Sequence, residues 1–363
     1  MPRIRARILV VAAATTAAVI GITGCSPEYW PAEETEETFE PGSTPAPSTL
    51  EDTLPKPSLT VPQFERVLDS VRDTFEQADA DLDADLLSSR AGGAVLEARS
   101  VSYRAQEADG DVEPIGGLPD GDVELILPEQ NESWPRHLLA VVSWQDETKV
   151  PEALVFRQAT ARSKFVLTYQ MYLQAGVQLP EVAASQVGAP VVSTESTLTQ
   201  LPPAEIPGAY ADIMSSGGDA EHAASFASEP DELRASLGYE RKQELYVDNE
   251  AFELIDFTFV NGEGDSPVIA LSTNDGGALV AASFTERIEF QPTEDGVSVT
   301  LPESRSGLRA LLGGEERIES GIARTDEYQV FFYVPPAARE GDEPQQIRVL
   351  GYNAALVEAE ELN

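Results

Sequence analysis

A single cysteine, Cys25, constrains the fold of this 363-residue chain more than any other feature. With one thiol the chain forms no internal disulfide, so the free energy that stabilises it must come from a buried apolar core. Hydrophobic residues make up 42% of the chain, and a chain of this length can bury a substantial core. At roughly 100–200 residues per domain, the length favours two domains.

The residues before Cys25 resemble a bacterial lipoprotein signal. A basic start with Arg3, Arg5 and Arg7 precedes an apolar stretch from Ile8 to Ile20, and small residues follow. In that pattern the Cys25 thiol receives a diacylglycerol, the chain is cleaved before it, and the new N-terminus is acylated. We therefore predict a signal peptide at 1–24 and a mature chain held at the extracytoplasmic face of the cell membrane by lipid on Cys25.

The alternative for Cys25 is an unmodified, buried thiol at the end of a short transmembrane helix. A spanning helix needs about 20 apolar residues, and the stretch from Ile8 to the Gly21 region is shorter. A diacylglycerol and an N-acyl chain together provide stable anchoring. The pattern therefore favours the lipid anchor over the transmembrane helix.

Residues 25–59 are rich in Pro, Glu and Thr. Such a segment buries too little apolar surface to offset its conformational entropy. We predict an extended stalk between the membrane and a folded part that begins near Thr60.

Charge limits the partners of the chain. Asp and Glu number 63 against 24 Lys and Arg, giving a formal net charge of −39. Binding to nucleic acid needs a basic stripe that contacts phosphates, and the sequence shows none. We expect no nucleic-acid partner, and we interpret the acidity first as a solvated, soluble surface.

Periodicity predicts helices followed by strands, twice. Thr60, Pro62 and Gln63 form a helix-start signal, and apolar residues from Phe64 to Phe75 repeat at helical spacing. A helix is expected at 83–90, and 95–108 is ambiguous between helix and strand. Strands are expected at 137–144, 153–158 and 164–173.

The second half is expected to repeat this plan. We predict helical segments within 206–237, strands at 245–260, 268–273, 278–290, 328–334 and 347–358, and a short helix at 304–312. The segments beginning at Pro151 and Pro267 share an order of proline, short strand, turn and long strand, which indicates a weak internal repeat. Asn274-Asp275-Gly276-Gly277 is typical of a hairpin turn.

The predicted class is therefore α+β, with two tandem domains of helices on a curved antiparallel sheet, at 60–187 and 205–363, joined by a linker at 188–204. The order of elements resembles tandem, cone-shaped domains of the nuclear-transport-factor-2-like kind. A β-sandwich with helical decorations is the competing fold.

No catalytic, cofactor or metal constellation emerges from the sequence. The two histidines, His137 and His222, lie far apart and have no cysteine partner for a zinc site. The alternating acids from Asp79 to Asp85 fail the calcium-loop template, because Ala84 and Arg90 occupy positions that need Gly and Glu. We therefore predict no cofactor and no metal, and Cys25 is the one candidate site residue.

Aromatic residues on the expected strands are predicted to form the core or to line a pocket. These residues are Trp134, Trp144, Phe156, Phe165, Tyr169, Tyr172, Phe252, Phe257, Phe259, Phe284, Phe290, Phe331, Phe332 and Tyr333.

Several short motifs resemble those of a family of actinobacterial lipoproteins that is defined only as a domain of unknown function. They are Arg90 with Gly92-Gly93, Trp134-Pro135-Arg136, Gly176-Val177-Gln178-Leu179-Pro180 and Tyr333-Val334-Pro335-Pro336, in addition to the Cys25 signal. Some members are labelled glycosyl transferases, but an exported protein has no supply of nucleotide sugars.

Three functions remain open. The leading hypothesis is a non-catalytic binding or envelope-assembly module, whose partner is an envelope protein. The second is a carrier of an apolar ligand in a cone-shaped pocket lined by Trp144 or Phe165. The third is a hydrolase of envelope glycans that uses a pair of acids.

Overall fold

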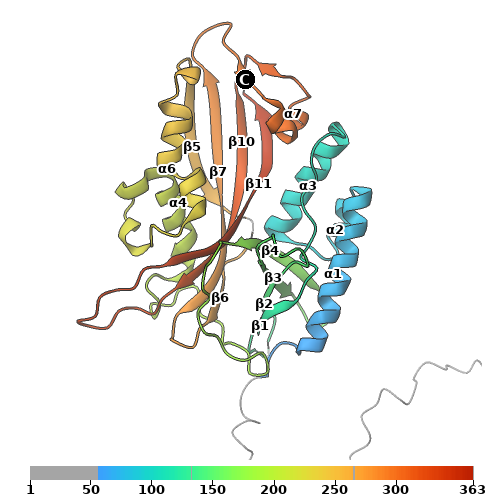
Figure 1. The fold of residues 1–363 in the computed structure, drawn as a ribbon, viewed down its shortest axis with the longest axis vertical. Helices are drawn as coiled ribbons and strands as arrows, with labels where there is room; N and C mark the ends of the chain where they lie inside the picture. The colour runs from blue at the N-terminus through green and yellow to red at the C-terminus, as the bar shows by residue number, and fades with distance from the viewer. Residues whose placement is uncertain (1–55, 132, 265, 363) are drawn as a thin grey trace, which may run out of the picture. The chain divides into compact units, whose positions relative to one another are not determined.

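The computed structural model describes residues 56–131, 133–264 and 266–362. The predicted signal peptide, Cys25 and the stalk up to residue 55 lie outside the described residues. Leu54–Asn363 forms one compact unit in which helices pack on an open, antiparallel sheet (Figure 1). The α+β class is confirmed.

The first half contains three helices and then four strands. They are α1 (Val61–Asp81), α2 (Ala84–Leu87), α3 (Gly93–Ala108), β1 (Val123–Pro128), β2 (Arg136–Val142), β3 (Glu152–Gln158) and β4 (Phe165–Leu173).

The second half begins with short helices and ends with long strands. The helices are η3 (Pro203–Glu205), α4 (Ile206–Ser216), η4 (Gly217–Asp219), η5 (Ala223–Ser225), α5 (Glu232–Leu237), α6 (Tyr239–Lys242), η6 (Gln243–Val247), η7 (Glu250–Phe252), η8 (Glu303–Arg305) and α7 (Ser306–Leu311). The strands are β5 (Ile255–Glu263), β6 (Ile269–Ser272), β7 (Ala278–Pro292), β8 (Val299–Thr300), β9 (Arg317–Ile318), β10 (Ile322–Val334) and β11 (Arg348–Glu361).

One nine-stranded sheet runs through both halves, in the order β1-β2-β3-β4-β11-β10-β7-β5, with β6 also paired to β7. Two residue pairs join the halves, Leu173 with Gly351 and Tyr172 with Tyr352. A Cβ on Gly351 would lie 2.5 Å from the Tyr172 carbonyl oxygen, so this close approach requires glycine. The two expected domains thus share one sheet, because β11 at the end of the chain pairs with β4.

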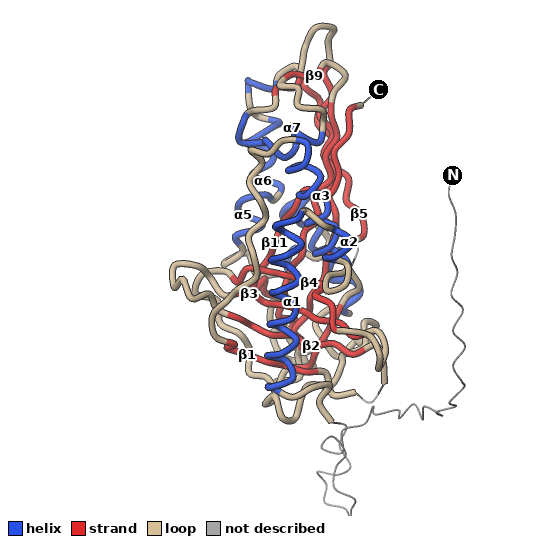
Figure 2. Tube along the Cα trace, turned by 90° about the vertical axis from the view of Figure 1, so that its right-hand side faces the viewer, coloured by secondary structure: helices blue, strands red, loops and turns tan. Residues whose placement is uncertain are grey.

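Three of the apolar clusters among the described residues separate the main layers. Helices α1, α2 and α3 cover one face of β2–β4, and α4 and α5 cover one face of β7, β10 and β11 (Figures 1 and 2). The third core lies between the other faces and contains side chains of both halves. We call it the shared core; its buried members include Val155, Tyr169, Met171, Leu279 and Phe331. This sandwich-like contact explains why the halves form a single compact unit.

Local signals explain the helices. Gln63 Oε1 accepts hydrogen bonds from the Thr60 N–H (2.8 Å) and hydroxyl (3.1 Å) at the start of α1. The buried residues of α1 then follow helical spacing: Phe64, Leu68, Val71, Phe75 and Ala78. The ambiguous stretch 95–108 is helical, because its Ala-rich face packs against β4 and β11.

Some predicted elements need correction. Within 245–254, expected as strand, residues 245–247 and 250–252 are helical, and the strand begins at Ile255. Tyr246 in that helical turn packs on Phe257 and Phe290, with ring centroids 5.1 and 5.7 Å away, so tertiary packing decides its structure. Strand β1 was not expected. Just before α1, the Ser58 N–H donates to the Glu129 carbonyl (2.8 Å) and Leu59 is buried.

Most of the aromatic residues are buried as predicted, but three of them do not lie on strands. Trp134 precedes β2 and is 40% exposed, Trp144 follows β2, and Phe252 lies in η7. The Asn274–Gly277 prediction is confirmed, because this turn joins β6 and β7 and Gly276 has a φ of +87°.

Candidate functional site

The structure brings few of the residues considered in the sequence into one place. His137 lies on β2, where its N–H and Nδ1 contact the buried Glu129 carboxylate at 2.7 and 2.8 Å. His222 lies at the start of η5. Asp79 is not simply solvated, because it pairs with Arg99, and Asp83 caps α2 by accepting from the Leu86 N–H. None of these contacts forms a catalytic arrangement.

A pocket of about 320 Å³ lies between α3, α7 and β11, and we call it the α3–β11 pocket. Its volume is near the lower end of the range for small-molecule sites. Ala98, Ser102 and Ala105 recur on one face of α3, and these small side chains leave space between the helix and Asn353–Leu356 of β11. The loop after α3 contributes Val112, Glu113 and Ile115 as a third wall.

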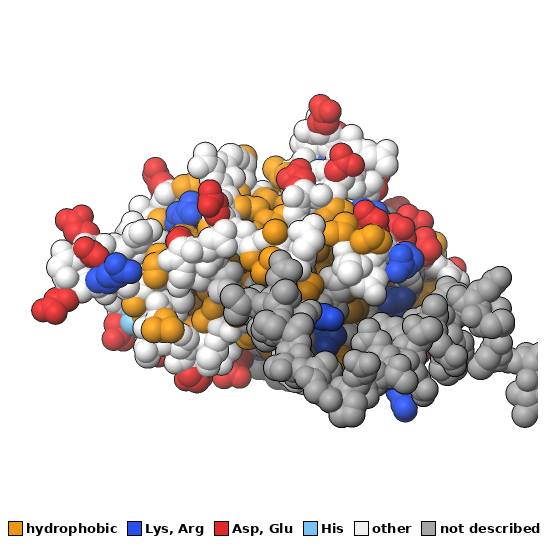
Figure 3. Space-filling model, turned by 90° about the horizontal axis from the view of Figure 1, so that it is seen from below, with side chains coloured by type: hydrophobic (Ala, Val, Ile, Leu, Met, Phe, Trp, Pro, Cys, Tyr) orange, Lys and Arg blue, Asp and Glu red, His pale blue; other side chains and the backbone are white. Residues whose placement is uncertain are grey.

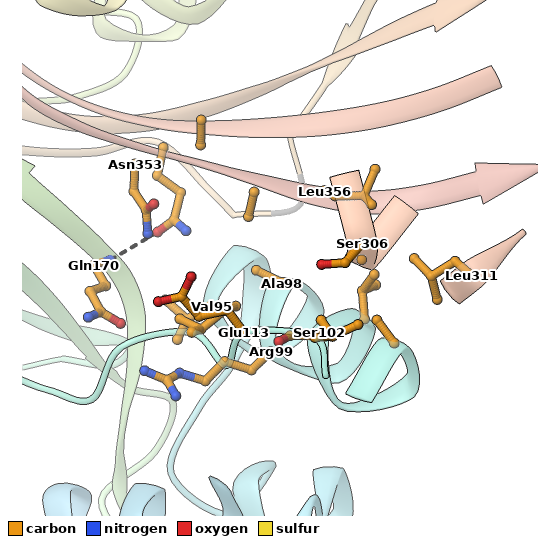
Figure 4. A pocket seen from close by; sticks show the side chains of 18 of the residues that line it. Val95, Ala98, Arg99, Ser102, Glu113, Gln170, Ser306, Leu311, Asn353 and Leu356 are labelled. Carbon is orange, nitrogen blue, oxygen red and sulfur yellow. Dashed lines mark hydrogen bonds between the residues drawn. The ribbon is translucent and has the colours of Figure 1, made fainter. Parts of the chain in front are cut away.

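The two ends of the pocket differ in chemistry (Figure 4). At one end lie Gln170 of β4, Asn353 of β11 and Arg99 of α3, together with Gln329 of β10. At the other end lie Leu311 and Leu356, and the Ser306 hydroxyl points toward the interior (Figure 4). Val101, Ala105 and Val112 extend the apolar part. The pocket therefore suits a molecule with a polar group and an apolar body.

Arg99 is almost completely buried in the wall of the pocket. Its Nη1 donates to both oxygens of Asp79 (2.7 and 2.8 Å), its Nη2 donates to the Gly116 carbonyl (2.7 Å), and its guanidinium lies 4.7 Å from the Phe75 ring centroid. Asp79 also accepts from the Tyr103 hydroxyl, whose pKa burial raises. The Arg99 charge is thus neutralised inside the wall. Among the described residues its Nε–H has no hydrogen-bond partner.

Behind the polar end, Glu152 is fully buried on β3. It accepts hydrogen bonds from Gln170 Nε2 (2.9 Å) and Trp144 Nε1 (3.1 Å). Burial raises the pKa of Glu152 to about 7, although these hydrogen bonds and the charges of Arg99 and Lys149 oppose the shift. Glu152 therefore changes its protonation state near neutral pH.

The pocket lacks the lining that we expected for a carrier. Phe165 is packed in the core under α1–α3, and Trp144 contacts Glu152 and Lys149, so neither lines the α3–β11 pocket. The sequence signal that could have indicated this pocket was the recurrence of small residues at helical spacing on α3. The partner residues on β4, β10, β11 and α7 come from distant parts of the chain and were missed.

Among the described residues that line the pocket, Glu113 is the one carboxylate, whereas the usual mechanisms of glycoside cleavage use two acids. Over residues 56–131, 133–264 and 266–362 no group of three or more metal-ligating side chains is found. In the same ranges no helix has both the length and the apolar character needed to cross a bilayer.

The surface carries the acidity of the sequence. Viewed from the end of the molecule at which β1 and β6 lie, acidic side chains stand mostly around the margin and hydrophobic side chains gather between them (Figure 3). An anionic ligand would approach such a protein against its net charge of −39. The charge thus favours neutral or cationic ligands.

Comparison with known proteins identifies one family. The model of a domain of unknown function (DUF8094) matches residues 55–361, which is most of the chain. No curated protein and no solved structure matches the chain.

Proposed function

We propose that this chain, which belongs to the DUF8094 family of domains of unknown function, is a non-catalytic lipoprotein that binds a small amphipathic ligand in the α3–β11 pocket. The polar group of the ligand lies at Gln170 and Asn353, and its apolar body lies against Leu311 and Leu356. The carrier hypothesis from the sequence expected a cavity lined by Trp144 or Phe165. The present proposal assigns the ligand instead to a pocket with one polar end and one apolar end.

The observation that carries the proposal is the convergence of three carboxamides on one end of the pocket. Gln170 and Gln329 are 3% and 2% exposed, yet both line the pocket, together with the half-buried Asn353. Polar groups that are buried at a cavity wall cost free energy unless they find partners. A ligand whose polar group pairs with them offsets that cost.

A pocket-filling variant tests the binding proposal. Ala355→Phe places a ring in the pocket from β11, and we expect it to lose a ligand that remains bound to the wild-type chain. Native mass spectrometry of both proteins, purified from the cells that make them, measures the bound mass. Ala359→Phe, four residues along the same strand and outside the pocket lining, is the matched control and should keep the ligand. Equal ligand retention in both variants would exclude this pocket.

Membrane anchoring through Cys25 is a second part of the proposal. It is supported by the basic start, the short apolar stretch and the position of Cys25 before a Pro-, Glu- and Thr-rich stalk. The anchor places the pocket at the extracytoplasmic face of the cell membrane. Membership of the actinobacterial lipoprotein family is a finer proposal that rests on the Cys25 signal and the short motifs given above. The nuclear-transport-factor-2-like architecture is another, and it rests on the order of helices and strands.

Cys25→Ser is expected to release the chain from the membrane, because the lipid has no thiol to join. Metabolic labelling with a radioactive fatty acid should mark the wild-type chain and leave the variant unlabelled. At least nine-tenths of the processed variant should be found in the soluble fraction, and any uncleaved precursor should carry no label. A labelled, membrane-bound Cys25→Ser chain would contradict the anchor.

An envelope-assembly role is the second candidate function. The observation that favours it is the exposure of apolar side chains in the segment between β4 and η3, where Val187, Val191 and Leu198 are 49%, 47% and 76% exposed. Such side chains mark a contact with another protein where they form one contiguous patch.

A further inference from the structure

We infer that the polar end of the α3–β11 pocket recognises a neutral amide group, with Gln170 Oε1 accepting from the amide N–H and Gln329 Nε2 donating to the amide oxygen. The inference rests on the proposed function, since it names the chemical group that the pocket binds. The apolar substituent of that amide then lies toward Leu311 and Leu356.

The orientation of the Gln170 side chain follows from its contacts. Gln170 Nε2 donates to Glu152 Oε2 at 2.9 Å and lies 3.4 Å from the Gly117 carbonyl oxygen. Both partners are acceptors, so the nitrogen must face them. The Gln170 Oε1 atom has no hydrogen bond to any described residue, and it is therefore available to accept one from a ligand.

Gln329 has the opposite orientation. Its Oε1 accepts the backbone N–H of Gln170 at 2.9 Å, a bond between β10 and β4 that Figure 4 draws as a dashed line. A backbone N–H needs an acceptor, so this contact fixes which end of the carboxamide is oxygen. Gln329 Nε2 then remains as a donor, without a partner among the described side chains. The pair offers one acceptor and one donor.

Charge favours a neutral group. Asp79 neutralises Arg99 within the wall, and Glu113, an exposed residue, adds a carboxylate to the lining of the pocket. A carboxylate or phosphate on the ligand would therefore meet the negative charge of Glu113, and the one cation among the described lining residues, Arg99, is already paired. An amide supplies both an N–H and a carbonyl oxygen without net charge, as the pair of glutamines requires. Asn353 can turn to add either a donor or an acceptor.

Glu152 acts as the positioning residue for Gln170. When ionised it is an acceptor only, so it holds the Gln170 nitrogen away from the pocket. When protonated it can donate, and Gln170 is then free to turn its nitrogen toward the ligand. The groups that face Glu152 are Gln170 and Tyr172 of β4, Trp144 and Lys149 of the loop after β2, and Arg99 of α3. Because burial raises the pKa of Glu152 to about 7, this change falls between pH 5.5 and pH 8.

Three probes of equal chain length test the inference: hexanamide, 1-hexanol and hexanoate. They are titrated into the full chain and followed by ¹H–¹⁵N NMR of the glutamine side-chain amides. At pH 8 we expect hexanamide to bind at least fivefold more tightly than the other two and to shift the Gln170 and Gln329 signals. The preference for hexanamide over hexanol should fall at least twofold at pH 5.5, although neither probe titrates in this range.

Two variants separate positioning from folding. Glu152→Gln should reduce the preference for hexanamide to less than twofold at pH 8 and abolish its pH dependence, while hexanol binding is unchanged. Gln345→Leu, at an exposed glutamine outside the pocket, should change nothing. Equal binding of hexanol or hexanoate, or no shift of the two glutamine signals with any probe, would overturn the amide assignment. Retention of a native ligand by the wild type and its loss in Ala355→Phe would still support the proposed function.

Discussion

Glu286→Ala is expected to lower the free energy of unfolding by about 3–5 kcal/mol, because it leaves a buried ammonium group without its carboxylate partner. Lys242 of α6 donates to Glu286 of β7 and to the Met214 carbonyl oxygen (3.1 Å). The two side chains are only 6% and 0% exposed. Burial lowers the pKa of Lys242 and raises that of Glu286, while each partner opposes the shift of the other.

The pair is not isolated on this face of the sheet. The Tyr328 hydroxyl lies 3.5 Å from Glu286 Oε2, and Arg324 pairs with Asp326 at 3.2 Å nearby on β10. Loss of one carboxylate therefore changes the charge balance of a buried group of four charged side chains, Lys242, Glu286, Arg324 and Asp326. Such a group is destabilised much more by removal of one member than by removal of a matched pair.

Chemical denaturation of the full chain measures the effect. The double variant Lys242→Met/Glu286→Leu should recover to within about 2 kcal/mol of the wild type, because apolar residues of similar volume replace both charges. Glu244→Ala breaks the exposed pair between Arg241 and Glu244 and should cost less than about 1 kcal/mol. If Glu286→Ala costs no more than this control, the pair is not buried as described.

Phe331→Ala is expected to cost about 3–5 kcal/mol, the range for removal of a fully buried phenylalanine. Phe331 lies on β10 in the shared core, so its loss should destabilise both halves together. In a Trp30→Phe background the remaining tryptophans, Trp134 and Trp144, both belong to the first half. Their fluorescence reports that half, although the substitution is in the other.

Thermal unfolding, followed by tryptophan fluorescence and by far-UV circular dichroism, tests whether the two halves unfold together. The two midpoints should coincide and fall together in Phe331→Ala. Val260→Ala, at a half-exposed position on β5, should change the free energy of unfolding by no more than about 0.5 kcal/mol with either probe. A fluorescence midpoint unchanged by Phe331→Ala would mean that the halves unfold independently.

Local chemistry made part of this fold predictable. The helix at 61–81 followed from Thr60, Gln63 and the spacing of its apolar residues, and the β6–β7 turn followed from Asn274-Asp275-Gly276-Gly277. The continuous sheet could not be predicted in this way, because it depends on the pairing of Tyr172 with Tyr352, which lies far along the chain. Nothing near either tyrosine encodes that partner.

The candidate site was hidden for the same reason. Ala98, Ser102 and Ala105 on α3 form a stripe of small residues, which by itself predicts close packing as readily as a cavity. Only the positions of β11 and α7 opposite the helix make it a pocket. The roles of Gln170 and Glu152 depend on contacts among β3, β4 and β10 that no spacing in the sequence reveals.

The most direct test of the account is a crystal structure of the full chain purified from the cells that make it. The account predicts electron density for an amphipathic molecule in the α3–β11 pocket, with its polar group within hydrogen-bond distance of Gln170 or Gln329 and its apolar part against Leu311 and Leu356. A pocket that contains only water, with a co-purified molecule bound elsewhere on the chain, would contradict it.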